Sequence, residues 1–183
     1  SSDLSGYLAI MREDFSGASV AFEKALAMRP DDTQVLEYLA RLDLMLGQQE
    51  NVQARIFRLL RLDPANAFGN FVLGGLQIGR REFELARDSL ARSIESEKTP
   101  EALNDLAWLL QESGLYSQAE QHAREALALR PEMAAAWDTL GVILMKTDRL
   151  EEAQAAFKKT LSLAAGNIPA ALHLAELALK QGR

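Results

Sequence analysis

The chain has 183 residues, of which 48% are hydrophobic and 25% charged, and its formal net charge is −6. It contains no cysteine, which excludes disulfides and thiolate metal sites. No apolar run reaches the roughly 18 residues of a membrane-spanning helix, and no region carries the positive stripe typical of RNA-binding helical arrays. We therefore expect neither membrane insertion nor nucleic-acid binding.

Small residues recur along the chain at intervals of 33 or 34 residues: Gly6, Ala40, Gly74, Ala107, Gly141 and Ala175. A fixed period of this size indicates a repeat array whose units stack on one another. Small residues are needed where two helices cross closely, because a larger side chain would push the helices apart. A large apolar residue follows at a fixed distance in most repeats, as at Phe22 and Phe157.

Each repeat holds two apolar-patterned segments separated by a short break, which predicts two amphipathic helices joined tightly. Helix-stopping residues occupy the break at Gly47, Gly114 and Asp148. The pattern predicts helical hairpins over residues 3–28, 33–62, 67–95, 100–129 and 134–163, and a lone helix over 168–180. About eleven helices are expected in total.

The fifth repeat carries the most complete motif: Trp137, Leu140, Gly141, Leu144, Leu150, Ala153, Phe157 and Leu161. With these residues the chain resembles the tetratricopeptide repeat (TPR) family over nearly its full length. The resemblance implies an all-α fold, a right-handed superhelical solenoid of antiparallel helix hairpins with five units plus one extra helix. Residues 1–183 are expected to form a single array that is a fragment of a longer protein. Its units are expected at about 1–32, 33–66, 67–99, 100–133 and 134–167, with a partial unit at 168–183.

The sequence offers little catalytic chemistry. His122 and His173 are 51 residues apart and fall in different, non-adjacent predicted helices, so they do not indicate a metal site. Nucleophile and phosphate-binding motifs are not found. We therefore expect no catalytic residues, metal or cofactor, and no enzymatic activity. Arg55, Arg58 and Arg61 are interpreted as a solvated outer face.

In the TPR family the first helices of successive units line a concave groove to which ligands bind. The resemblance places ten residues on this surface: Tyr7, Arg41, Met45, Phe71, Gly75, Ile78, Asn104, Trp108, Asp138 and Met145. Several of these are apolar or aromatic, and exposed apolar groups on such a surface indicate a binding site. Trp108 is expected to be partly exposed there, whereas Trp137 is expected to be buried in the core.

Two functions are compatible with this pattern. The favoured one is a non-enzymatic protein–protein interaction scaffold that binds a peptide or a partner protein in the concave groove. The alternative is an architectural segment of a longer bacterial array for envelope or exopolysaccharide-export assembly, because LNDLAWLL and WDTLG resemble strings of such proteins. The compartment stays open between the bacterial periplasm or cell envelope and the cytoplasm.

The last predicted helix has more apolar surface than one neighbour can cover. Ala171, Leu174, Ala175 and Ala178 are expected to pack on the fifth unit. Leu172, Leu177 and Leu179 lie outside that stripe, which predicts self-association through the helix Ile168–Lys180.

Overall fold

The computed structural model describes residues 2–180, and within that range every helix or strand assigned is an α-helix. The helices are α1 (Ser2–Met11), α2 (Phe15–Met28), α3 (Thr33–Met45), α4 (Gln49–Leu62), α5 (Ala67–Gly79), α6 (Phe83–Ser96), α7 (Pro100–Glu112), α8 (Tyr116–Leu129), α9 (Ala134–Lys146), α10 (Leu150–Leu163) and α11 (Ile168–Lys180). The outer boundaries of the expected hairpins agree with these helices to within one residue. The all-α fold of helix hairpins is therefore confirmed.

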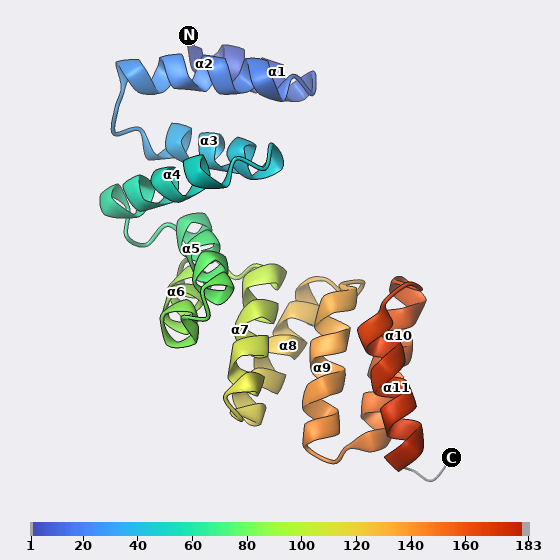
Figure 1. Cartoon of the computed structure of the whole chain (residues 1–183). Helices are drawn as coiled ribbons and strands as arrows, with labels where there is room; N and C mark the ends of the chain where they lie inside the picture. The colour runs from blue at the N-terminus through green and yellow to red at the C-terminus, as the bar shows by residue number, and fades with distance from the viewer. Residues whose placement is uncertain (1, 181–183) are drawn as a thin grey trace. The chain divides into compact units, whose positions relative to one another are not determined.

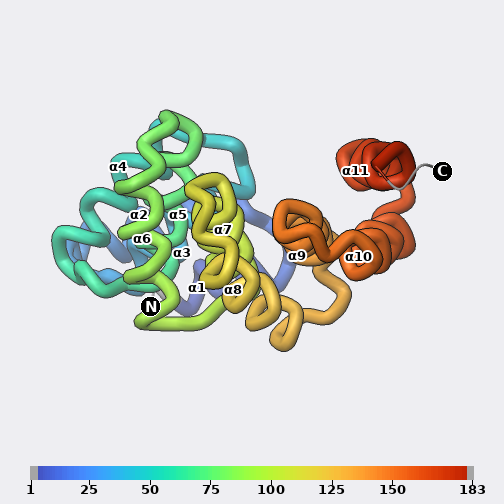
Figure 2. Tube along the Cα trace, turned by 90° about the horizontal axis from the view of Figure 1, so that it is seen from below, coloured from blue at the N-terminus to red at the C-terminus, as the bar shows by residue number. Residues whose placement is uncertain are grey.

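The chain is divided into two compact units, Ser1–Glu82 and Phe83–Arg183. In the first unit each helix from α1 to α5 packs on the next, and in the second each helix from α6 to α11 does the same (Figure 1). Within the second unit α7 also contacts α9, and α9 contacts α11. The first helices α7, α9 and α11 follow one another in a row, and α8 and α10 lie on one side of this row (Figure 2). The single continuous array and its right-handed winding stay predictions.

The turn inside each hairpin contains one residue with a positive φ angle. These residues are Glu13, Gly47, Arg81, Gly114 and Asp148, with φ between 58° and 75°. This conformation ends the first helix, because the next backbone N–H groups then bond to carbonyls of its last turn, as Gln48 N does to Asp43 O at 2.8 Å. The left-handed region strains L-residues other than glycine. Two of the five turns are therefore formed despite the local preference of Glu13 and Arg81, whereas aspartate, as at Asp148, tolerates this conformation.

Close helix crossings explain the recurring small residues. A Cβ atom on Gly141 would lie 2.6 Å from Cε1 of the fully buried Phe157, and one on Gly6 would lie 2.7 Å from Cζ of the fully buried Phe22. The phenyl ring of the second helix thus occupies the space that a side chain on the first helix would need. Ala40 and Ala107 are fully buried at the equivalent positions, but Ala175 on α11 is exposed.

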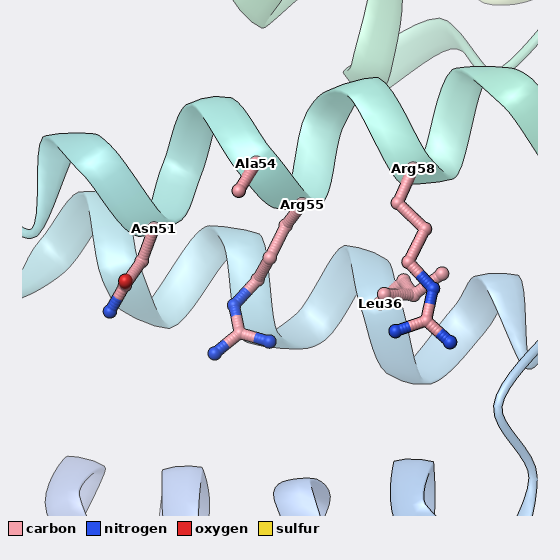
Figure 3. A pocket seen from close by; sticks show the side chains of 5 residues that line it. All are labelled: Leu36, Asn51, Ala54, Arg55 and Arg58. Atoms are coloured by element: carbon pink, nitrogen blue, oxygen red, sulfur yellow. The ribbon is translucent and has the colours of Figure 1, made fainter.

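The arginines of α4 link neighbouring helices of the first unit. Arg55 Nε contacts the buried carboxylate of Asp43 on α3 at 2.5 Å, and its Nη2 bonds Glu23 on α2. Arg58 donates to the carbonyl of Pro30. The side chains of Arg55 and Arg58 both extend from α4, and Leu36 lies beside Arg58 (Figure 3). The interpretation of a solvated outer face is therefore wrong for Arg55 and Arg58, which are half-buried and join adjacent hairpins, whereas Arg61 is exposed.

Candidate functional site

The first helices of the second unit enclose an open hollow of about 220 Å³. Seven residues line it: Trp108, Gln111 and Glu112 from α7, Asp138, Thr139 and Val142 from α9, and His173 from α11. Their spacing of three or four residues on α7 and α9 places them on one face of each helix. We call this surface of α7, α9 and α11 the first-helix face of the second unit.

Two polar atoms in this hollow are buried without a hydrogen-bond partner in the described part of the chain: Asp138 Oδ1 and His173 Nδ1. They lie 3.7 Å apart, which is longer than a hydrogen bond. Burial raises the pKa of Asp138, while the nearby His173 acts in the opposite direction. The imidazole of His173 also packs on the ring of Phe157, with 4.8 Å between the ring centroids. The hollow therefore contains a poorly solvated carboxylate oxygen that can accept a hydrogen bond.

Trp108 supplies the aromatic surface of the hollow. Its ring packs edge-on against Phe83, with 6.1 Å between centroids and 75° between planes, and the side chain is half-buried. Trp137 was expected to be fully buried, and this expectation is wrong, because Trp137 is also only half-buried. Its indole Nε1 donates to the carbonyl of Pro131 at 2.8 Å, which keeps the polar edge of the ring near the surface.

Two residues expected on the open groove are buried in the second unit. Asn104 is 7% exposed, and its Oδ1 accepts a 2.9 Å hydrogen bond from Thr139 Oγ1, so it joins α7 to α9. Met145 is 8% exposed and belongs to the hydrophobic core. Asn104 is covered because α7 and α9 pack side by side.

The first unit has a second, more apolar hollow of about 350 Å³. It is lined by Asp43, Leu44, Gly47, Gln49, Val52, Gly75, Leu76 and Gly79. Among the expected groove residues only Gly75 lines it, and a Cβ atom there would meet no other atom within 4 Å. Met45 is 63% exposed, and Ile78 is half-buried without lining the hollow.

The remaining groove candidates of the first unit take part in packing. Tyr7 packs edge-on against Phe22 and Tyr38, with centroid distances of 5.4 and 5.1 Å. Phe71 is partly buried against the core. The guanidinium of Arg41 lies 3.9 Å above the Phe68 ring and also bonds Glu37, so it is already paired.

The structure thus brings together only Trp108 and Asp138 of the ten expected site residues in the hollow of the second unit. The other five residues of its lining are not among the ten: Gln111, Glu112, Thr139, Val142 and His173. His173 had been considered only as a metal ligand, and no group of three His, Cys, Asp or Glu side chains in residues 2–180 is arranged to hold a metal ion. None of the described helices has the length and hydrophobicity to cross a membrane.

The packing of α11 differs from the expected stripe. Ala170 and Leu177 are buried, and His173, Leu174 and Ala178 are half-buried. Ala171 and Ala175 were expected to pack inward but are exposed, and Leu177 was expected to be surplus but is fully covered. The reason is that the small position of each first helix faces its own second helix, and no described helix packs there on α11. The exposed apolar face consists of Ile168, Ala171, Leu172, Ala175 and Leu179.

Comparisons with known proteins agree with this architecture. A family model described as "Tetratricopeptide repeat" matches residues 104–168. The chain is 30% identical over 113 residues to mouse (Mus musculus) tetratricopeptide repeat protein 21A, covering 60% of this chain and 8% of that protein. It is 26% identical over 141 residues to type IV pilus assembly protein PilF of Pseudomonas aeruginosa, covering 75% of this chain and 56% of PilF. It thus spans only part of the length of both relatives.

Among solved structures, YrrB, described as a TPR protein with an unusual peptide-binding site, superposes with a TM-score of 0.75 at 19% identity. That match covers 90% of this chain and 86% of YrrB, and at this identity it shows the fold alone. The hairpin geometry, the recurring glycine–phenylalanine crossings and these matches lead to one conclusion. Residues 104–168 match the tetratricopeptide repeat family, and the chain as a whole has the helix-hairpin fold of solved tetratricopeptide repeat proteins.

Proposed function

We propose that this chain is a non-enzymatic scaffold that binds a peptide or an exposed segment of a partner protein on the first-helix face of the second unit. The observation that carries the proposal is the hollow there, in which the half-buried Trp108 lies beside Asp138 and Val142. Aromatic side chains in such hollows often supply much of the binding energy of an interface. YrrB, which shares the fold, is described as having a peptide-binding site, and this supports peptide as the ligand class.

Peptide selection followed by calorimetry tests the proposal. Peptides are selected from a random displayed library on the wild-type chain, and their affinities are then measured for two variants. Trp108→Ala should lower the affinity at least about tenfold, because it removes the aromatic wall of the hollow. Phe57→Ala is the matched control, since Phe57 is 47% exposed on α4, a second helix. Wild-type affinity in Trp108→Ala, or failure to select any peptide, would contradict the proposal.

The exposed face of α11 supports a second binding role, self-association. Ile168, Leu172 and Leu179 are 69%, 64% and 78% exposed, and Ala175 lies between them on the same face. A second copy that places its own α11 there would cover both faces at once through a two-fold contact. Light scattering should then show a mass that rises with concentration, and Leu172→Glu with Leu179→Glu should abolish the rise.

The matched control for self-association is Val20→Glu with Met28→Glu, which adds the same charge at two exposed apolar positions of α2. This control should associate like the wild type. A wild-type chain that stays monomeric up to sub-millimolar concentration would refute self-association. The alternative role as an architectural segment of a bacterial envelope or export assembly stays a prediction.

A further inference from the structure

The hollow of the second unit has an uneven balance of charge. Glu112 and Asp138 contribute carboxylates, whereas no lysine or arginine is found among the described residues that line it. The helix α7 carries Glu101, Asp105 and Glu112 and no basic residue. Glu101 is paired with Arg130, which leaves Asp105 and Glu112 as the negative groups of α7 on or near this face. A cation in the hollow would therefore meet two carboxylates, and His173 is the one basic side chain among the described residues that line it.

One of these acceptors is unsatisfied. Asp138 Oδ1 is buried and has no hydrogen-bond partner in the described chain, although buried polar atoms in proteins are nearly always paired. His173 Nδ1 lies 3.7 Å away, beyond hydrogen-bond distance, and forms an ion pair with this carboxylate only when the imidazole is protonated. A hydrogen-bond donor that enters the hollow would pair with the carboxylate oxygen. That hydrogen bond would be stronger than the same bond in water, because the carboxylate is charged and poorly solvated.

The walls of the hollow suit a long side chain with a charged end. Trp108 and Val142 provide apolar surface along which methylene groups can lie, and the face of an indole ring attracts a cation. Glu112 lies at the exposed rim, where its carboxylate accepts a hydrogen bond from Gln111 Nε2. The acceptors are thus found at two places, on Asp138 inside and on Glu112 at the rim.

We propose that this hollow binds a basic side chain, arginine or lysine, of the bound polypeptide, with its stem on Trp108 and its charged end at Asp138 and Glu112. The inference rests on the proposed peptide-binding function and adds the chemical class of the residue that is recognised. The guanidinium of arginine offers several donors in one plane and can stack on Trp108, whereas lysine offers a compact charge with three donors. Both satisfy the buried carboxylate oxygen.

The test uses the peptides selected from the random library. Under the proposal they share an arginine or lysine at one position. Replacing that arginine by citrulline, or that lysine by acetyllysine, removes the charge and keeps the length of the side chain. Calorimetry should then show an affinity at least about tenfold lower, because a hydrogen bond to a charged group is worth roughly that factor.

Protein variants identify the groups that recognise the charge. Asp138→Asn with Glu112→Gln should lower the affinity for the charged peptide to the level of the neutral one, and in this variant the neutral swap should have no further effect. Glu132→Gln with Glu151→Gln, at two exposed positions that do not line the hollow, is the control for loss of two negative charges and should bind as the wild type does. Circular dichroism checks that each variant keeps its helix content, and the peptide swap leaves the protein unchanged in any case.

Four results would overturn the inference, and those that concern the basic side chain alone are distinguishable from a failure of peptide binding. Selected peptides that share no basic residue overturn it, and so do peptides that bind equally well after the neutral swap. In both cases the proposal of peptide binding still holds if Trp108→Ala lowers the affinity. Equal loss of affinity for charged and neutral peptides in the Asp138→Asn, Glu112→Gln variant also overturns the inference, since the carboxylates would then act on the fold rather than on the charge. Failure to select any peptide overturns both proposals.

Discussion

Capping side chains recur at the starts of the first helices. Asp32, Asn66, Thr99 and Asn167 each accept a hydrogen bond from the backbone N–H three residues later, at 3.1, 2.8, 3.3 and 2.9 Å. Such a bond satisfies one of the N–H groups that a helix start leaves unpaired. Met133 holds the same place before α9 and makes no such bond. The fifth hairpin therefore lacks a stabilising contact that its neighbours have.

A cap introduced at this place should stabilise the protein. We expect Met133→Asn to raise the free energy of unfolding by about 1 kcal/mol over Met133→Ala, because both remove the same apolar side chain and only asparagine adds a cap. Asn167→Ala should lower it by a similar amount. Urea unfolding followed by circular dichroism measures both. If Met133→Asn were no more stable than Met133→Ala, the local backbone would not present a free N–H to the new side chain.

Single residues also show what the sequence could not predict. Gly47, Gly114 and Asp148 indicated turns, and each adopts the positive φ angle. Glu13 and Arg81 adopt it as well, although neither residue type favours it. At Glu13 the packing of α1 on α2 requires this turn, and at Arg81 the repeat period places the same turn between α5 and α6. Local preference alone would have missed them.

At the scale of the helix pair, glycine has opposite roles in two helices. A Cβ atom on Gly141 of α9 would lie 2.6 Å from Phe157, whereas one on Gly75 of α5 would meet nothing within 4 Å. Gly141→Ala should therefore lower the free energy of unfolding by about 1–3 kcal/mol through overpacking. Gly75→Ala should raise it by about 0.5–1 kcal/mol, because alanine favours the helix. Chemical unfolding of both variants is the measurement, and the same sign for both would contradict the close crossing at Gly141.

Ion pairs join the last two complete hairpins. Arg149, the residue before α10, contacts Glu120 of α8 at 2.8 Å, and Arg124 of α8 contacts the same carboxylate at 2.7 Å. Burial works to raise the pKa of Glu120, but hydrogen bonds from Arg124 and Arg149 outweigh it and hold that pKa below its ordinary value of 4.5. A lowered pKa in the folded state means that ionised Glu120 stabilises the fold.

The pH dependence follows from the direction of this shift. The contribution of Glu120 is complete above pH 4.5 and is lost as the pH falls through the lower pKa of the folded state. Glu120→Gln should therefore be less stable than the wild type at neutral pH, and the difference should shrink in acid. Thermal unfolding between neutral pH and pH 3 measures it, with the exposed Glu132→Gln as the control. A difference that is constant across this range would show that Glu120 acts through its shape rather than its charge.

At the scale of the whole chain, periodicity predicted the fold far better than it predicted the site. Six small residues at a regular interval located every hairpin, because the same two-helix packing is repeated. Where one repeat departs from the motif, the spacing of the other repeats still shows where its helices lie. The side chains of the site depend on how adjacent first helices cover one another. Asn104 and Met145 fall on the predicted groove face and are nevertheless buried, Asn104 through its contact with Thr139 of α9, whereas His173 lines the hollow from α11. No pattern within a single helix contains that information.

The same neighbour-by-neighbour packing determines how far a defect should spread. Phe22 in the first unit and Phe157 in the second are both fully buried, so replacing either by alanine should lower stability by about 3–5 kcal/mol through the cavity that it leaves. In a repeat array each hairpin is stabilised mainly by the hairpins next to it. Phe157→Ala should therefore accelerate hydrogen exchange in α8 to α11 while α1 to α4 exchange as in the wild type. Phe22→Ala should do the reverse, and mass spectrometry of peptic fragments would resolve the two regions. Loss of protection in both regions with either variant would mean that the two compact units unfold as one body.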